Sequence, residues 1–234
     1  HDALPIFLLS SALGLAQRST MDIDFLLRQM PLNADAIEKV LKEVIAVEVG
    51  DNVRFSFDAI ESIRQEDEYG GYRVTLLGRL ENVKESVTID IATGDPIVPG
   101  AVDYGYRCLF EDEVLHFQAY NFETIIAEKL QTVLARGILN SRSKDYFDIY
   151  IIRKLRWEEI DGQVLKEAFS ATCRHRNTFF ADVEAKQILS RIRADAQMEQ
   201  RWNSFRKKNK FVGEVMFQDA VNAALEVADA ACVK

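Results

Sequence analysis

Apolar and polar residues alternate along much of the first half of the chain, and this pattern predicts β-strands. Met21, Ile23 and Phe25 alternate with Asp22 and Asp24. On a strand the three apolar side chains would enter a core while both carboxylates project from the opposite face. The same kind of pattern, interrupted by polar or glycine-containing turns, predicts strands over 53–60, 72–80 and 86–91 and a short hairpin over 107–110 and 114–117.

Helical spacing marks the remaining segments and replaces the strand pattern after residue 120. Asn33 and Asn121 are expected to cap two of these helices, and Gly137 to end the second. The predicted helices cover 8–16, 33–47, 121–136, 143–153, 160–173, 183–203 and 215–230. The chain is therefore predicted to be α+β, with a sheet and flanking helices over 1–118 and an all-helical half over 119–234.

Composition favours an ordinary globular protein. The chain has 234 residues, of which 48% are hydrophobic, and this is enough to fill a sizeable core. It has no apolar run of about 18 residues and no secretory signal pattern, so no membrane contact and a cytoplasmic location are expected. Cys108, Cys173 and Cys232 are too scattered for a disulfide framework and are interpreted as reduced thiols.

The charge distribution is informative about nucleic-acid binding. A net charge of −8 argues against a surface that is positive throughout. A local basic cluster nevertheless lies within 201–210, around Trp202 and Phe205. It is either a solvated helix end or a contact for nucleic acid.

Three carboxylates form the first candidate site. Asp22 and Asp24 would share one strand face, and Asp90, on the strand over 86–91, can stand beside them. Mg²⁺ takes oxygen ligands and is usually held by one or two carboxylates together with substrate phosphates, so the arrangement indicates nucleotide chemistry. The alternative is that these residues cap strand ends or are simply solvated.

A second candidate site lies on two predicted helices. Lys129, Thr132 and Arg136 follow one another at helical spacing, and Asp145 and Asp148 share one face of the next helix. Cations can neutralise phosphate charge, and a carboxylate can accept or orient a hydroxyl proton. The alternative is a set of surface ion pairs, each worth about 0–1 kcal/mol.

Taken in order, these motifs resemble the AbiEii family. The matching segments are Arg18-Ser19-x-x-Asp22-x-Asp24, Asp90 on a strand, Ala127-Glu128-Lys129-Leu130 with Arg136, and Lys144-Asp145-x-x-Asp148. The resemblance runs from about Leu8 to Lys154, and the remainder matches only as a helical extension. AbiEii proteins are nucleotidyltransferase-like toxins of type IV toxin–antitoxin systems, within the DNA polymerase β-like superfamily. The resemblance thus implies a nucleotidyltransferase-like mixed sheet.

The resemblance also implies roles for individual residues. The metal ligands would be Asp22, Asp24 and Asp90. Lys129 would contact the nucleotide phosphates, and Asp145 would complete the active site and act on the attacking hydroxyl. Further residues at the nucleotide would be Arg18, Ser19, Arg136, Lys144 and Asp148.

One segment departs from the family pattern. Family members carry a Gly-Gly pair shortly before the Asp-x-Asp strand, and here that place holds about Pro5-Ile6. The chain also begins without methionine, so we expect residues 1–7 to be non-native and part of the phosphate-binding loop to be missing. On this interpretation the activity of this copy would be impaired.

The implied function is Mg²⁺-dependent or Mn²⁺-dependent transfer of a nucleoside monophosphate from a nucleoside triphosphate to an acceptor, with the tRNA 3′ end one candidate. The protein would act as the toxin of an abortive-infection system in phage defence. Its antitoxin would be an AbiEi-like protein encoded nearby, and direct contact is not required. Two alternatives stay open: a catalytically inactive nucleotide-binding interaction protein, and a small-molecule nucleotidyltransferase.

Overall fold

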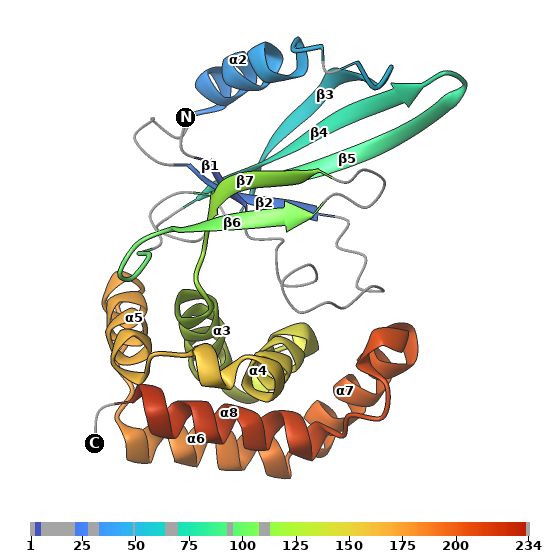
Figure 1. The fold of residues 1–234 in the computed structure, drawn as a ribbon. Helices are drawn as coiled ribbons and strands as arrows, with labels where there is room; N and C mark the ends of the chain where they lie inside the picture. Colours follow the sequence, from blue (N-terminus) through green and yellow to red (C-terminus); the bar gives the residue numbers. More distant parts are fainter. Residues whose placement is uncertain are drawn as a thin grey trace. The chain divides into compact units, whose positions relative to one another are not determined.

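The structure consists of two compact units, one built on a sheet and one helical (Figure 1). This computed structural model describes residues 3–5, 22–27, 33–48, 50–63, 70–92, 96–107 and 113–232, with side chains except in 3–5, 22–24 and 26–27. The sheet unit comprises His1–Leu8, Ser19–Gly94 and Asp103–Ala119. The helical unit comprises Leu9–Arg18, Asp95–Val102 and Tyr120–Lys234. The helix predicted over 8–16 lies outside the described residues.

The sheet unit is built on a five-stranded mixed sheet with the strand order β1-β2-β5-β4-β3. The strands are β1 (Ala3–Pro5), β2 (Asp22–Leu27), β3 (Arg54–Ile63), β4 (Gly71–Leu80) and β5 (Val83–Ala92). β2 pairs with β5 in parallel, whereas the other neighbouring strands are antiparallel. The predicted mixed sheet with flanking helices is therefore confirmed.

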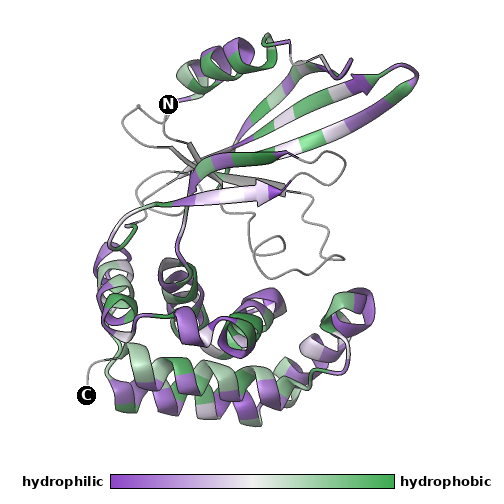
Figure 2. Cartoon of the chain, viewed as in Figure 1, coloured by the Kyte–Doolittle hydropathy of each residue, from purple (hydrophilic) through white to green (hydrophobic). Residues whose placement is uncertain are grey.

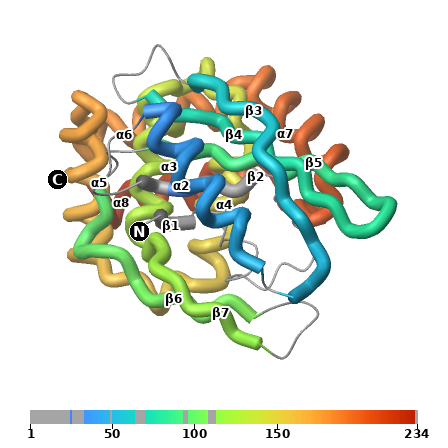
Figure 3. Tube along the Cα trace, turned by 90° about the horizontal axis from the view of Figure 1, so that it is seen from above, coloured from blue at the N-terminus to red at the C-terminus, as the bar shows by residue number. Residues whose placement is uncertain are grey.

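One face of this sheet is covered by helix α2 (Ala34–Ile45), which lies across the strands in Figure 3. Ile37 of α2 is 2% exposed and packs with Val74, Leu76, Ile89 and Ile91 of β4 and β5. Each such fully buried aliphatic side chain stabilises the fold by about 1.5–3 kcal/mol. The alternation of hydrophobic and polar positions along β4 and β5 is visible in Figure 2, and it leaves one face of the sheet for polar residues.

A separate two-stranded sheet is formed by β6 (Val102–Arg107) and β7 (Val114–Ala119). The predicted start of the first strand, at 107, was wrong, because β6 begins five residues earlier. Residues 108–110 of the predicted strand lie outside the described part. Tyr104 and Tyr106 alternate along β6, and their ring centroids lie 5.9 and 6.3 Å from that of Phe117 on β7. This aromatic packing accounts for the observed strand position.

The helical unit contains six α-helices within the described residues. They are α3 (Phe122–Arg136), α4 (Ser143–Leu155), α5 (Gly162–His175), α6 (Asp182–Ala194), α7 (Ala196–Lys208) and α8 (Phe217–Ala231). Short 3₁₀ turns cover Gly137–Leu139, Trp157–Glu159 and Lys210–Val212. Helix α8 is rich in buried alanine, and its small side chains allow close packing against α4, α5 and α6. Figure 1 shows α8 lying along α6.

The two asparagine N-caps and the glycine helix end predicted from the sequence are confirmed. Asn33 Oδ1 accepts a hydrogen bond from the Ala36 amide at 2.8 Å, and Asn121 Oδ1 accepts one from the Thr124 amide at 2.8 Å. Gly137, with φ of 52°, ends α3 in the left-handed region that glycine tolerates. Within the described residues, no helix is both long enough and apolar enough to cross a membrane.

The single helix predicted over 183–203 was wrong. The structure divides this segment into α6 and α7 at Asp195, whose Oδ1 accepts a hydrogen bond from the Met198 amide at 2.9 Å. Because Asp195 has an extended backbone and caps α7, it interrupts a continuous apolar pattern.

Candidate active site

The register between β2 and β5 brings two of the predicted metal ligands to neighbouring backbone positions. Asp24 is the direct Cα partner of Asp90, and Asp22 is the partner of Thr88. The side chains of Asp22 and Asp24 lie outside the described part of the structure. Their proposed role as metal ligands therefore stays a prediction.

Asp90 is held by an arginine that the sequence pattern did not reveal. Arg73 on β4 is the cross-strand partner of Asp90. Its Nε donates to Asp90 Oδ1 and its Nη2 to Asp90 Oδ2, both at 2.8 Å. The Asp90 side chain is only 15% exposed. Such a bidentate pair fixes the orientation of the carboxylate.

The fit of this region to a divalent cation is therefore mixed. The carboxylate oxygens of Asp90 suit a hard cation, and a carboxylate keeps lone pairs for a second partner when arginine occupies it. The positive charge of Arg73, however, opposes a cation beside the same carboxylate. Among the residues with described side chains, no cluster of three or more acidic, histidine or cysteine residues could hold a metal ion.

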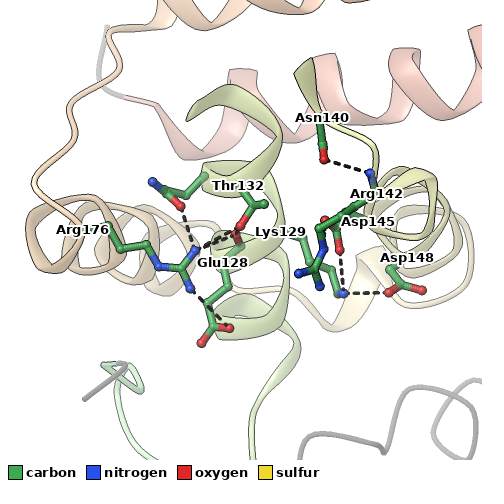
Figure 4. Close-up of polar contacts among 9 residues, drawn as sticks. Glu128, Lys129, Thr132, Asn140, Arg142, Asp145, Asp148 and Arg176 are labelled. Carbon is green, nitrogen blue, oxygen red and sulfur yellow. Dashed lines mark hydrogen bonds and ion pairs between the residues drawn. The ribbon is translucent and has the colours of Figure 1, made fainter. Parts of the chain in front are cut away.

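The helical unit brings Lys129 of α3 together with Asp145 and Asp148 of α4, as Figure 4 shows. Lys129 Nζ lies 2.7 Å from Asp148 Oδ2 and 3.5 Å from Asp145 Oδ1. The Asp145 and Asp148 side chains are 3% and 0% exposed, and that of Lys129 is 17% exposed. The i, i+3 spacing of the two aspartates places both on the face of α4 that meets α3.

Arg142 supplies the second cation of this cluster. Arg142 precedes Asp145 by three residues, and its Nε lies 3.0 Å from Asp145 Oδ2. Asn140 Oδ1 accepts a hydrogen bond from the Arg142 amide at 3.0 Å and so orients the segment that leads into α4. The two cations, of which Arg142 is 51% exposed, thus balance the charge of the two buried carboxylates. We call Lys129, Arg142, Asp145 and Asp148 the lysine–aspartate cluster.

Tyr146 follows Asp145 on α4 and is almost completely buried. Burial raises the pKa of the Tyr146 phenol well above its ordinary value, although the nearby Asn140 side chain acts in the opposite direction. The phenol therefore stays protonated at neutral pH. Carboxylates are the better candidates for accepting a proton in this part of the molecule.

A different arginine binds the other side of α3. Arg176, at the end of α5, donates through Nη1 to Gln131 Oε1 at 2.8 Å and to Thr132 Oγ1 at 3.1 Å. Thr132 Oγ1 also donates to the Glu128 carbonyl at 2.8 Å. Figure 4 shows Arg176 and Lys129 on opposite sides of the helix. Thr132 therefore contributes to α3–α5 packing and does not face the lysine–aspartate cluster.

Two of the other predicted residues lie outside the lysine–aspartate cluster. Arg136 is exposed in the last turn of α3, about two turns from Lys129. Lys144 is exposed in the first turn of α4, next to Asp145. Arg18 and Ser19 lie outside the described residues.

Two residues in these contacts were absent from the predicted site. Arg142 precedes Asp145 by three positions, so helical spacing alone could have indicated the pair. Arg73 lies 17 positions before Asp90 and contacts it only through the pairing of β4 with β5. Its role could not be inferred without the strand register.

Comparison with known proteins gives a match to one protein family. A family model described as the nucleotidyl transferase AbiEii toxin of a type IV toxin–antitoxin system matches residues 7–227. No curated protein matches the chain.

Two solved structures are similar. The crystal structure of a candidate nucleotidyltransferase from H. pylori is 14% identical, with a TM-score of 0.53, and the match covers 97% of this chain and 85% of that one. The crystal structure of JHP933 from Helicobacter pylori is 16% identical, with a TM-score of 0.45, over 98% of this chain and 82% of that one. The first of these likenesses shows that the fold is shared with a nucleotidyltransferase-like structure.

Proposed function

Because this chain belongs to the AbiEii family of nucleotidyltransferase toxins of type IV toxin–antitoxin systems, we propose that it transfers a nucleoside monophosphate from a nucleoside triphosphate to an acceptor hydroxyl. The observation that carries the proposal is the lysine–aspartate cluster, with its two buried carboxylates and two cations. Family membership implies a triphosphate substrate and an antitoxin partner, and the cluster supplies chemistry suited to that substrate.

The reaction has one bond-forming and one bond-breaking event. The acceptor oxygen attacks the α-phosphorus of the triphosphate and forms a new O–P bond. The bond from the α-phosphorus to the oxygen that bridges it to the β-phosphorus breaks, and pyrophosphate leaves. A divalent cation, when bound, would stabilise charge on the triphosphate oxygens, and Asp22, Asp24 and Asp90 are the residues proposed to hold it.

The residues of the helical unit would position and neutralise the reacting groups. Lys129 would place positive charge next to the triphosphate, where negative charge increases as pyrophosphate leaves. Asp145 would accept the proton of the attacking hydroxyl, and Arg142 and Asp148 would hold Asp145 and Lys129 in place. Four further residues are proposed to contact phosphates: Arg136 and Lys144, which are exposed, and Arg18 and Ser19.

Family membership also motivates the biological part of the proposal. The chain would inhibit growth of its host as the toxin of an abortive-infection system that defends against phage. An AbiEi-like antitoxin encoded nearby would counter it, with no direct contact required. The acceptor proposed is an RNA, with the tRNA 3′ end the first candidate, and the reaction would take place in the cytoplasm with Mg²⁺ or Mn²⁺.

Radioactive transfer tests the proposal. The chain is incubated with Mg²⁺, each α-labelled nucleoside triphosphate and total bacterial RNA, and the products are separated by gel electrophoresis. We expect label on an RNA band, and we expect that label to disappear with Asp22→Ala and when the divalent cation is removed by EDTA. Equal labelling by Asp22→Ala would exclude the proposed metal role, and no label on RNA, protein or small molecules would contradict nucleotidyl transfer.

A further inference from the structure

The helical unit contains an open groove of about 740 Å³ between the start of α4 and helix α7. Four of its lining residues are cationic: Arg142 and Lys144 on the α4 side, and Arg201 and Lys208 on α7. None of its lining residues is acidic, and the others are serine, glutamine, asparagine and one phenylalanine. On a chain with a net charge of −8, this concentration of positive charge selects an anionic ligand.

The groove has a fixed wall. Arg201 Nη1 donates to the Ile138 carbonyl at 3.0 Å and to the Asn140 carbonyl at 3.4 Å. These bonds connect α7 to the segment between α3 and α4 and so link the two sides of the groove. The guanidinium of Arg201 is held in place and does not need to be ordered when a ligand binds, which lowers the entropic cost of binding.

The uncharged lining suits a phosphodiester chain. Serine hydroxyls and glutamine amides are common partners of phosphate and sugar oxygens, and they position a backbone without reading sequence. Phe205 adds an aromatic surface to the groove, and its ring is held 5.8 Å from Trp202 and 6.2 Å from Phe211, centroid to centroid. Cationic grooves that contain aromatic side chains are typical of proteins that bind single-stranded nucleic acid.

The groove adjoins the lysine–aspartate cluster, because both include Arg142. The same guanidinium that lines the groove binds Asp145 at 3.0 Å. A chain molecule lying in the groove would therefore pass Arg142, the residue that contacts Asp145. A strand whose end is to be modified needs this arrangement, with its backbone bound in the groove and its terminal hydroxyl at the carboxylate.

We propose that this groove binds the phosphodiester backbone of a single-stranded RNA whose terminal hydroxyl is the acceptor. This inference rests on the proposed nucleotidyl transfer and adds to it a binding surface that lies within one unit of the molecule. Lys144, Arg201 and Lys208 contact phosphates, and Arg142 lies where the groove meets the lysine–aspartate cluster.

Fluorescence anisotropy with a labelled single-stranded RNA of twelve nucleotides, without nucleoside triphosphate, tests the groove directly. The test variant is Lys144→Gln with Lys208→Gln. The matched control is Lys166→Gln with Lys207→Gln, which removes the same charge from two exposed positions outside the groove. Lys208→Gln alone serves as a second variant, because Lys208 is not among the proposed nucleotide-binding residues.

Each lost phosphate contact should reduce the salt dependence of log K by about 0.7 and weaken binding about fivefold at 0.1 M salt. We therefore expect about a 25-fold loss for the double groove variant, about a fivefold loss for Lys208→Gln, and little change for the control. Equal affinity of the groove and control variants would overturn the proposal. So would competition by poly-glutamate as strong as that by RNA, since this would indicate an acidic protein partner.

Transfer activity is measured separately on the unchanged chain. The unchanged chain could label RNA while the groove and control variants bind RNA equally well. This result would contradict the proposed role of the groove and support the proposed nucleotidyl transfer. Groove-dependent RNA binding without transfer to any acceptor would confirm the groove as an RNA-binding surface. It would contradict the proposed nucleotidyl transfer and, with it, the role of the bound RNA as acceptor.

Discussion

At the scale of single residues, the lysine–aspartate cluster joins a strong structural role to the proposed chemistry. Asp148 is fully buried, and Lys129 Nζ lies 2.7 Å from its Oδ2. Helical spacing predicted that Asp145 and Asp148 share a face of their helix, and in the structure Lys129 contacts both. Spacing could not predict the pairing of Arg73 with Asp90, which depends on the register of β4 against β5.

Removing the positive charge of Lys129 should destabilise the folded chain. Lys129→Ala leaves two buried carboxylates with only Arg142 as a cation in the cluster, and breaking a buried pair in this way costs about 3–5 kcal/mol. Urea unfolding followed by circular dichroism measures the loss. Adding Asp148→Asn removes one unbalanced charge and should recover a large part of it; a double variant as unstable as Lys129→Ala would show that the loss comes from packing.

Arg73 should weaken cation binding at Asp90. Its guanidinium lies 2.8 Å from both carboxylate oxygens, so Arg73→Gln removes a positive charge next to the proposed metal ligand. Because like charges at this range repel, the Mg²⁺ affinity measured by calorimetry should rise about threefold to tenfold in this variant. Asp90→Asn is the control that should lower the affinity. An unchanged Mg²⁺ affinity in both variants would show that Asp90 is not a metal ligand.

At the scale of helices and strands, patterns predicted the type of most segments better than their boundaries. Alternation identified β3, β4 and β5, and asparagine caps identified the starts of α2 and α3. The break between α6 and α7 was missed because apolar residues continue through it. Its signal was Asp195, a strong N-cap residue in the middle of the predicted helix.

Asp195 should therefore matter for the stability of α7. Asp195→Ala removes the acceptor for the Met198 amide, and loss of an N-cap of this type costs about 1 kcal/mol. Thermal and urea unfolding would show the difference. Asp195→Asn preserves the capping oxygen and should remain close to the original stability, whereas equal losses in both variants would indicate that the carboxylate charge matters more than the cap.

At the scale of the whole molecule, the change from strand to helical patterning near residue 120 predicted an α+β chain with a helical second half. The pattern could not show which distant segments pack together within a unit. Asp95–Val102, for example, groups with the helical unit, where Asn121 Nδ2 donates to the Val98 carbonyl at 2.6 Å. Such a contact depends on tertiary packing and leaves no periodic signal in the sequence.

The most direct test of the account is the rate of pyrophosphate release from nucleoside triphosphate in the presence of Mg²⁺ and acceptor RNA. Asp145→Asn is compared with Asp182→Asn, the same substitution at a carboxylate that pairs with Lys186 on α6, away from the lysine–aspartate cluster. Both variants are first shown to remain folded by circular dichroism. The account predicts that Asp145→Asn lowers the rate at least about 100-fold, as expected for loss of a general base, and that Asp182→Asn leaves it unchanged. A folded Asp145→Asn variant that releases pyrophosphate at the original rate would contradict the account.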